Sequence, residues 1–284
     1  MPAAGAHRAA ALVRSTHPGP AAAVTVVAVL LGLAVGLEPW RVAVLGVAIL
    51  FDQVSVGLSN DWIDAERDRA VGRSDKPVAL GQIGARTVRN TALAAAVVGV
   101  LLTLPLGVPA TIVHLVTLVS AWAYNAGLKN SPLSVAPYVV SFGLLPSIAS
   151  LARPTPVLPA WWVFVAGALL GIAAHFANVL PDLEDDRRTG IQGLPHRLGL
   201  RPSILITWAA LLLGAVAVTV GVAEGPGGLP IFAVVGLLIS SVISILGTVL
   251  ALRRGVGRWL FRLVILAALV DVAMLVLAGT RMLA

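Results

Sequence analysis

Residues 42–68, VAVLGVAILFDQVSVGLSNDWIDAERD, join an apolar stretch to a row of carboxylates. The apolar part, residues 42–60, has the length that a helix needs to cross about 30 Å of bilayer. The part that follows, residues 60–68, carries four acidic side chains at the end of that helix. Ionisable groups at such a depth are costly and usually have a partner or a function. This stretch therefore predicts a membrane helix that ends in a polar site.

A second acidic stretch repeats the arrangement further along the chain. Residues 178–186, NVLPDLEDD, follow the apolar segment 160–181. Nine of the thirteen acidic residues lie between residues 61 and 75 or between 182 and 186. Two such clusters amid basic residues indicate a divalent metal that holds a polyphosphate.

The composition fits a polytopic membrane protein. Hydrophobic residues make up 58% of the chain and charged residues 12%, whereas a soluble domain has about 25% charged residues. The absence of cysteine excludes disulfides and thiolate chemistry. The net charge of +7 could suggest a nucleic-acid partner, but its distribution argues against one. We expect an integral protein of a bacterial-type plasma membrane.

Nine apolar segments are long enough to span a bilayer. The sequence therefore predicts an all-α membrane protein, with nine transmembrane helices in a single domain over residues 1–284. Residues 1–19 form an Ala-rich, basic arm without a clear signal-cleavage site. The expected spans are residues 20–37, 42–60, 90–108, 110–127, 134–152, 160–181, 203–223, 229–251 and 259–280.

The basic residues predict the orientation, because cytoplasmic loops carry an excess of lysine and arginine. With the N-terminus in the cytoplasm, only Arg41, Arg153 and Arg281 fall outside. Both acidic motifs then face the cytoplasm, and nine spans place the C-terminus outside. The inner residues are Arg8, Arg14, Arg67, Arg69, Arg73, Lys76, Arg86, Arg89, Lys129, Arg187, Arg188, Arg197, Arg201, Arg253, Arg254, Arg258 and Arg262.

Helical spacing selects the candidate metal ligands. At 100° per residue, Asn60, Asp64 and Asp68 fall within an arc of roughly 80° on one helix face. A second helix offers a similar stripe of side chains. Mg²⁺ prefers hard oxygen ligands and often bridges substrate phosphates. The second stripe consists of His175, Asn178, Asp182 and Asp186.

The alternative interpretation is that acidic groups solvate helix ends and offset nearby arginines. It suits the acidic residues that lie off the two stripes. These are Asp61, Glu66, Asp75, Glu184 and Asp185.

Basic side chains near the motifs are candidates for binding the diphosphate. Arg67, Arg73 and Lys76 follow the first motif, and Lys129 ends the stretch Tyr124–Lys129 at a cytoplasmic helix end. Fixed cations can stabilise the charge on a departing pyrophosphate. The alternative for each of them is a surface charge that only sets topology.

These motifs together resemble those of the UbiA-type intramembrane prenyltransferases. The first motif continues into residues 72–77, GRSDKP, and the second into residues 194–199, LPHRLG. Tyr124 and Lys129 match the family's tyrosine and lysine element. The resemblance implies a helical bundle around a central cavity, a polyprenyl diphosphate held by Mg²⁺, and chemistry at an allylic carbon.

The mechanism that the resemblance implies is electrophilic. Metal ions and Lys129 draw electron density into the diphosphate, with Asp64 and Asp182 holding metal. A carbocation-like carbon is then attacked by an aromatic or other lipophilic acceptor. A UbiA-like terpene cyclase, which folds the chain onto itself, is the alternative. A third hypothesis is a non-enzymatic membrane protein or a lipid transporter, which would more plausibly contain broken helices in repeated halves.

Four polar residues bear on the acceptor. Relatives that use 4-hydroxybenzoate tend to carry an arginine where this chain has Gln53. Asp52 lies on the stripe of Asn60 two turns deeper, where it could take up a proton, bind an acceptor hydroxyl, steady a cation, or make a structural contact. Asp271 and His175 could also act, although a structural contact is the simpler interpretation for each.

Overall fold

The structure is a computed structural model that describes residues 2–183, 190–225 and 227–284. This part of the chain is helical, and its β structure is a single isolated bridge between Pro159 and Leu283. The long helices are α1 (Pro2–Ser15), α2 (Pro18–Ala34), α3 (Pro39–Ile63), α5 (Ala85–Thr103), α6 (Val108–Ala126), α7 (Ala136–Leu151), α8 (Trp161–Val179), α11 (Leu200–Ala223), α12 (Ile231–Arg254) and α13 (Arg258–Ala278). The short ones are α4 (Ala65–Ala70), α10 (Leu194–Leu198) and the 3₁₀ turns Leu104–Leu106, Leu128–Asn130, Leu180–Asp182 and Gly279–Met282.

Proline and glycine mark several of these boundaries. Pro18 and Pro39 are the first residues of α2 and α3, where a missing N–H leaves no bond unmade. Gly127 ends α6 with φ 153°, and Gly255 ends α12 with φ 76°. Both values lie in the region that glycine adopts at low cost.

Each of the nine predicted spans falls on a long helix, but the count of nine membrane spans is not confirmed. Seven helices in the described part are long and apolar enough to cross a bilayer, or eight if the bent pair of helices His7–Ser15 and Pro18–Ala34 forms one span. The two halves of that pair meet at 56°. Helix α7 is shorter, with 16 residues. The predicted N-terminal arm thus contains helix α1.

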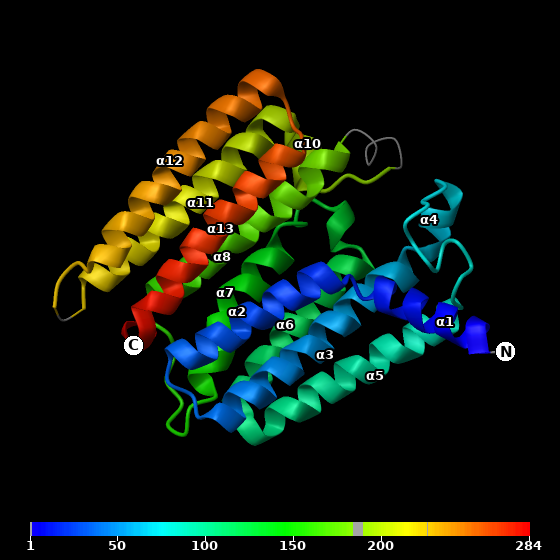
Figure 1. The fold of residues 1–284 in the computed structure, drawn as a ribbon, viewed down its shortest axis with the longest axis horizontal. Helices are drawn as coiled ribbons and strands as arrows, with labels where there is room; N and C mark the ends of the chain where they lie inside the picture. Colours follow the sequence, from blue (N-terminus) through cyan, green and yellow to red (C-terminus); the bar gives the residue numbers. More distant parts are fainter. Residues whose placement is uncertain (1, 184–189, 226) are drawn as a thin grey trace.

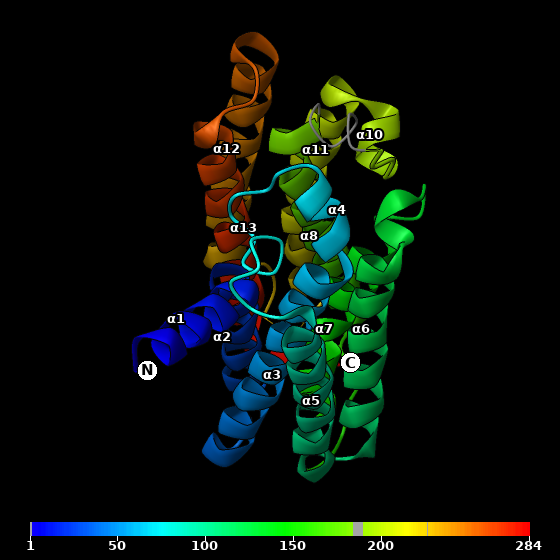
Figure 2. The same ribbon diagram turned by 90° about the vertical axis from the view of Figure 1, so that its right-hand side faces the viewer.

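Helix α8 lies between two groups of helices (Figure 1). On one side it contacts α11, which packs with α12 and α13. On its other side α8 contacts α7, which leads through α6 to α3, α5 and α2. Helix α4, which contains the end of the first acidic motif, and α10, which follows the second, lie at the same end of the bundle in both views (Figure 1 and Figure 2).

Glycine allows α8 to approach α7 closely. A Cβ atom on Gly171 would lie 2.4 Å from the backbone oxygen of Tyr138, and one on Gly167 would lie 2.5 Å from that of Phe142. No side chain fits in this space without a shift of the backbone. The contact therefore determines where Tyr138 and Phe142 stand in the cavity described next.

Candidate functional site

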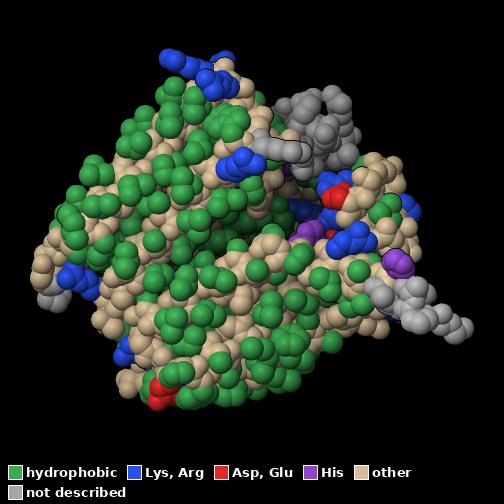
Figure 3. All heavy atoms as spheres, in the orientation of Figure 1, with side chains coloured by type: hydrophobic (Ala, Val, Ile, Leu, Met, Phe, Trp, Pro, Cys, Tyr) green, Lys and Arg blue, Asp and Glu red, His purple; other side chains and the backbone are tan. Residues whose placement is uncertain are grey.

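A cavity of about 310 Å³ lies among helices α2, α3, α6, α7 and α8. Figure 3 shows it as a hollow with mainly hydrophobic walls, and basic, acidic and histidine side chains gather at one end of it. The polar or aromatic residues that line it are Thr16, His17, Asp52, Gln53, Asn60, Thr117, Tyr124, Asn125, Tyr138, Ser141, Phe142 and Asn178.

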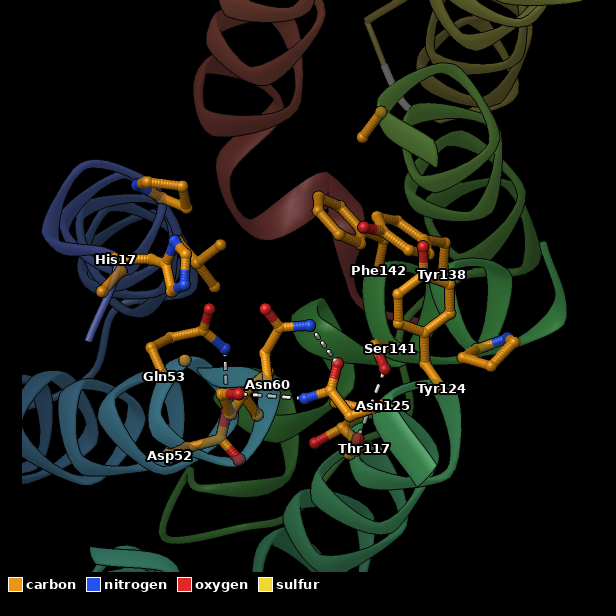
Figure 4. A pocket seen from close by; sticks show the side chains of 18 of the residues that line it. His17, Asp52, Gln53, Asn60, Thr117, Tyr124, Asn125, Tyr138, Ser141 and Phe142 are labelled. Atoms are coloured by element: carbon orange, nitrogen blue, oxygen red, sulfur yellow. Dashed lines mark hydrogen bonds between the residues drawn. The ribbon is translucent and has the colours of Figure 1, made fainter. Parts of the chain in front are cut away.

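Aromatic rings form one wall of this cavity (Figure 4). The rings of Tyr124 and Tyr138 meet edge to face with centroids 5.2 Å apart, and Tyr138 stacks on Phe142 at 6.0 Å. Such faces carry negative charge density that attracts cations. Asp52 and Gln53 from α3 lie across the cavity from this wall.

The first motif occupies the junction of α3 and α4. The sequence predicts one continuous helix there, whereas α3 ends at Ile63 and α4 begins at Ala65. Asp64 has ψ −4°, far from the helical value of about −42°. Hydrogen bonds to the fourth preceding residue persist, from Asp64 N to Asn60 O at 3.0 Å and from Asp68 N to Asp64 O at 2.8 Å. The stripe is thus bent, but its members stay close together.

Asp64 is buried and surrounded by polar partners. Lys129 forms an ion pair with its carboxylate, Arg67 Nη2 lies 3.0 Å from Oδ2, and Asn60 Nδ2 donates to the same oxygen at 3.1 Å. Burial lowers the pKa of Lys129 below its usual value, and the charge of Asp64 opposes that shift. The 3₁₀ turn after α6 therefore brings Lys129 to the first motif from 65 residues away.

Asp68 lies in the same cluster. Its Oδ1 accepts a hydrogen bond from Arg67 Nη2 at 3.1 Å. Its Oδ2 is buried and has no hydrogen-bond partner within the described ranges. A buried carboxylate oxygen in that state is well suited to a cation.

A second buried ion pair lies beside the first. Lys76 Nζ is 2.7 Å from Asp61 Oδ1, and His17 Nε2 is 2.9 Å from the same oxygen. Lys76 also donates to Asn60 Oδ1 at 3.1 Å. The side chain of Asp61 is only 1% exposed, so its interpretation as a solvated helix-end charge is wrong.

Arg73 differs from the other predicted diphosphate ligands. Its Nε and Nη2 donate to the two carboxylate oxygens of Asp75, both at 2.8 Å, and this guanidinium lowers the pKa of Asp75 to about 2. The two side chains are 42% and 59% exposed. This pair therefore lies at the surface.

The second motif departs from the predicted straight stripe. Helix α8 ends at Val179, and Leu180–Asp182 form a 3₁₀ turn that contains Pro181. Proline has no N–H to continue the helical bonding. Asn178 reaches the cavity, where its Nδ2 lies 3.4 Å from the hydroxyl of Tyr138. The side chain of Asp182 and all of Asp186 lie outside the described part, as do Glu184 and Asp185.

The remaining predicted residues have distinct positions. His175 is buried, with Nε2 3.0 Å from Ser134 Oγ and its ring against Tyr138. Asp271 is buried between α12 and α13, where it accepts a hydrogen bond from Ser240 Oγ at 3.1 Å. Asp52 lines the cavity, and its Oδ2 accepts a hydrogen bond from Gln53 Nε2 at 2.8 Å.

Several lining residues carried no signal strong enough to be selected from the sequence. Asn125 follows the predicted Tyr124. Its Oδ1 accepts a hydrogen bond from Asn60 Nδ2 at 3.3 Å, and its Nδ2 donates one to Ser59 Oγ at 2.8 Å. His17 reaches the motif from the bend between α1 and α2, where its φ is 53°. Its position before Pro18 marks a turn but says nothing of a partner in α3.

The donors suit a hard divalent cation. Asn60 lines the cavity and is bonded to Asp64, and Arg67 joins Asp64 to Asp68, whose Oδ2 has no hydrogen-bond partner within the described ranges. Where side chains are described, no group of three Asp, Glu, His or Cys residues forms a complete site. The second motif would have to supply the other ligands.

The site thus combines a buried acidic and basic cluster with an apolar cavity inside a bundle of apolar helices. Residues 21–267 match the UbiA prenyltransferase family, and the chain belongs to that family.

Two curated relatives match part of this chain. A 4-hydroxybenzoate octaprenyltransferase of Salmonella paratyphi C is 24% identical over 66% of this chain and 66% of its own length. A digeranylgeranylglyceryl phosphate synthase of Sulfolobus acidocaldarius is 26% identical over 56% of this chain and 58% of its own length. The similarity thus spans less than two thirds of either relative.

Solved structures show the same fold. A UbiA homologue from Archaeoglobus fulgidus bound to GPP and Mg²⁺ superposes with a TM-score of 0.75 at 13% identity, over 94% of this chain and 99% of its own. A UbiA homologue from Aeropyrum pernix K1 gives a TM-score of 0.72 at 17% identity, over 94% and 97%. At these identities the likeness concerns the fold alone.

Asp61 and Asp75 both lie outside the stripe, and each pairs with a basic side chain. Their substitution should lower the free energy of unfolding by very different amounts. Asp61→Asn leaves Lys76 buried without its counter-charge, and breaking such a pair costs about 3–5 kcal/mol. Asp75→Asn makes the same chemical change in an exposed pair and should cost less than about 1 kcal/mol. Unfolding of both variants in one detergent, followed by circular dichroism, measures the difference. Equal losses would contradict the burial of the Asp61 pair.

Proposed function

We propose that this protein is a Mg²⁺-dependent intramembrane prenyltransferase. In this proposal it ionises a polyprenyl diphosphate and transfers the prenyl group to an aromatic or other lipophilic acceptor. The observation that carries the proposal is the cluster of Asp64, Lys129 and Arg67 beside Asn60, which lines the apolar cavity. Charges that would be costly in a membrane are concentrated where a charged head and a long apolar tail could both be held.

Both motifs would hold the metal ions. When held there, Mg²⁺ would supply positive charge that offsets the charge of the diphosphate. The side chains of this chain would provide oxygen ligands from two opposing helix ends. The proposed ligands are Asn60, Asp64, Asp68, Asn178, Asp182 and Asp186.

Fixed cations would bind the remaining diphosphate oxygens. Arg67 and Lys129 already lie against Asp64, so their charges are compensated before any substrate binds. Tyr124 lines the cavity next to that cluster. Lys76 is held by Asp61 and would act from the side of the site, whereas Arg73 would act at its exposed rim. Positive charge placed in advance stabilises the departing pyrophosphate.

The cavity suits the reacting carbon. Its walls are mainly apolar, and the rings of Tyr124, Tyr138 and Phe142 face the enclosed space. Such walls exclude water that would capture a carbocation, and aromatic faces attract a developing positive charge. With Gln53 at the position that is arginine in many relatives using 4-hydroxybenzoate, we favour an acceptor without a carboxylate.

The orientation is also part of the proposal. The two acidic motifs would face the cytoplasm, and α2 and α7 would cross the membrane to make nine spans, with the C-terminus outside. The excess of basic residues in the loops on the motif side supports this arrangement.

The first-motif aspartate should be essential for turnover. Asp64→Ala removes a proposed metal ligand that no other residue of its stripe can replace. Mg²⁺-dependent pyrophosphate release should therefore fall to background, and Asp182→Ala should have the same effect. Glu66→Ala is the matched control, because Glu66 is exposed whereas Asp64 is buried. Pyrophosphate release by purified, folded protein with several prenyl diphosphates is the measurement. Activity above about a tenth of wild type in Asp64→Ala would refute the metal assignment.

Lys129→Ala should slow ionisation because a fixed cation is lost where negative charge grows. The loss of one such contact typically lowers the rate about 10²–10³-fold. Single-turnover pyrophosphate release at saturating substrate reports that step. An unchanged rate in a folded variant would reduce Lys129 to a topology signal.

The absence of cysteine allows a direct test of the orientation. Thr155 lies in the exposed turn after α7, and Ser74 lies in the exposed loop after α4. Each is replaced by cysteine in a separate variant, Thr155→Cys or Ser74→Cys. A membrane-impermeant maleimide added to intact cells should label position 155 at once and position 74 only after permeabilisation. The reverse pattern would invert the proposed topology, and labelling of neither or both positions in intact cells would reject the crossing of α7.

A further inference from the structure

A separate cluster of buried polar side chains lies behind one wall of the cavity. Asp52 of α3 lines the cavity and is 5% exposed, whereas His114 of α6 and Thr103 at the end of α5 are fully buried. Helix α5 approaches this point closely, since a Cβ on Gly99 would lie 3.2 Å from the backbone nitrogen of Asp52. Polar groups from three helices that meet in an apolar interior are costly unless they bond to one another.

Thr103 determines which nitrogen of His114 carries a hydrogen. The hydroxyl of Thr103 donates its single hydrogen to the backbone oxygen of Val100 at 2.7 Å. Toward His114 Nδ1, 3.3 Å away, that hydroxyl can therefore only accept. The hydrogen in this contact must lie on Nδ1, so Nε2 of the neutral imidazole has a free lone pair.

That lone pair faces Asp52. His114 Nε2 lies 3.4 Å from Asp52 Oδ1, while Oδ2 is already bonded to Gln53. Neither Nε2 nor Oδ1 has a hydrogen-bond partner in the described part of the chain. The 3.4 Å separation is longer than an N–H···O hydrogen bond, as expected for two acceptors that face each other. A single proton placed between them would satisfy both atoms.

We propose that Asp52 and His114 form a one-proton acceptor site that takes up the proton lost when the new prenyl bond forms. This inference rests on the proposed function. Asp52 is the catalytic residue because it borders the cavity, and His114 is a positioning residue behind it. Thr103 holds His114 in the tautomer that can share the proton.

The step balances as follows. The allylic C–O bond breaks, and its electron pair leaves with the diphosphate. An electron pair of the acceptor forms the new bond to the allylic carbon. The acceptor then loses one proton to Asp52, the member of the pair that borders the cavity, and its bonding pair stays on the acceptor. His114 Nε2 shares that proton until it leaves through the cavity to water.

A substrate-free experiment tests the tautomer. In protein labelled with ¹⁵N-histidine, with the His114→Gln variant for assignment among the five histidines, Nδ1 of His114 should carry a hydrogen. Thr103→Val keeps the shape of the side chain but removes the acceptor, so the signal should change. A bare Nδ1 in wild type, or no effect of Thr103→Val, overturns the proposal.

A second experiment separates proton transfer from ionisation. The protein is incubated with labelled geranylgeranyl diphosphate, Mg²⁺ and a lipid extract of the producing cells, which serves as the source of acceptor. The measured quantity is the ratio of prenylated product to pyrophosphate. Asp52→Asn should lower this ratio by about 10², His114→Gln and Thr103→Val by less, with pyrophosphate release within about threefold of wild type. Thr207→Val, which makes the same change as Thr103→Val in a buried hydroxyl of α11 that does not line the cavity, should leave the ratio unchanged.

The outcomes distinguish the two levels of the argument. An unchanged ratio in Asp52→Asn, or a parallel loss of product and pyrophosphate, overturns the proton-acceptor site and leaves the transferase intact. If the wild-type protein releases no pyrophosphate, the proposed function is refuted, and the proton transfer to Asp52 is refuted with it. The ¹⁵N signal of His114 still tests the geometry of the Asp52–His114 pair.

Discussion

The buried carboxylate of Asp64 is the feature on which the rest of the site depends. A carboxylate that is taken out of water needs compensating charge and hydrogen bonds. Lys129 and Arg67 provide the charge, and Asn60 the amide donor. These partners come from three segments, so pairing with Asp64 ties the turn after α6 and the start of α4 to the end of α3. The same need for compensation explains why the neighbouring Asp61 is paired with Lys76 and His17.

The long helices place this charged end above an apolar cavity. Glycines of α8 allow close contact with α7, and that contact positions Tyr138 and Phe142 along one wall. The opposite wall belongs to α3, which carries Asn60 at the charged end and Asp52 deeper in the bundle. One helix thus spans the whole length of the site. A change in the packing of α3 would move both ends together.

The family, the membrane location and the helical architecture could be predicted because spacing along one helix and hydropathy are local properties. Asp64 and Lys129 could each be selected from the motif and from a helix end, whereas their ion pair was not predicted. His17, Asn125 and His114 could not be selected, because each gains its role from a partner on another helix. The end of helix α3 at Ile63 was not predicted either. Backbone hydrogen bonds to the fourth preceding residue continue through Asp64, so the helical spacing of the motif persists across the break. Asp61 was misread because its burial depends on Lys76, whose position comes from a loop.

Two separate charge problems arise in the proposed reaction, and α3 places a carboxylate near each. Negative charge grows on the diphosphate at the level of Asp64, where cations are gathered. In the proposal the acceptor loses its proton to Asp52, which lies twelve residues before Asp64 and thus about 18 Å away along the helix at about 1.5 Å per residue. A base among the cations at the mouth would be neutralised by them. Separation along one helix therefore allows a single apolar cavity to hold an electrophilic centre and a proton acceptor without their cancelling each other.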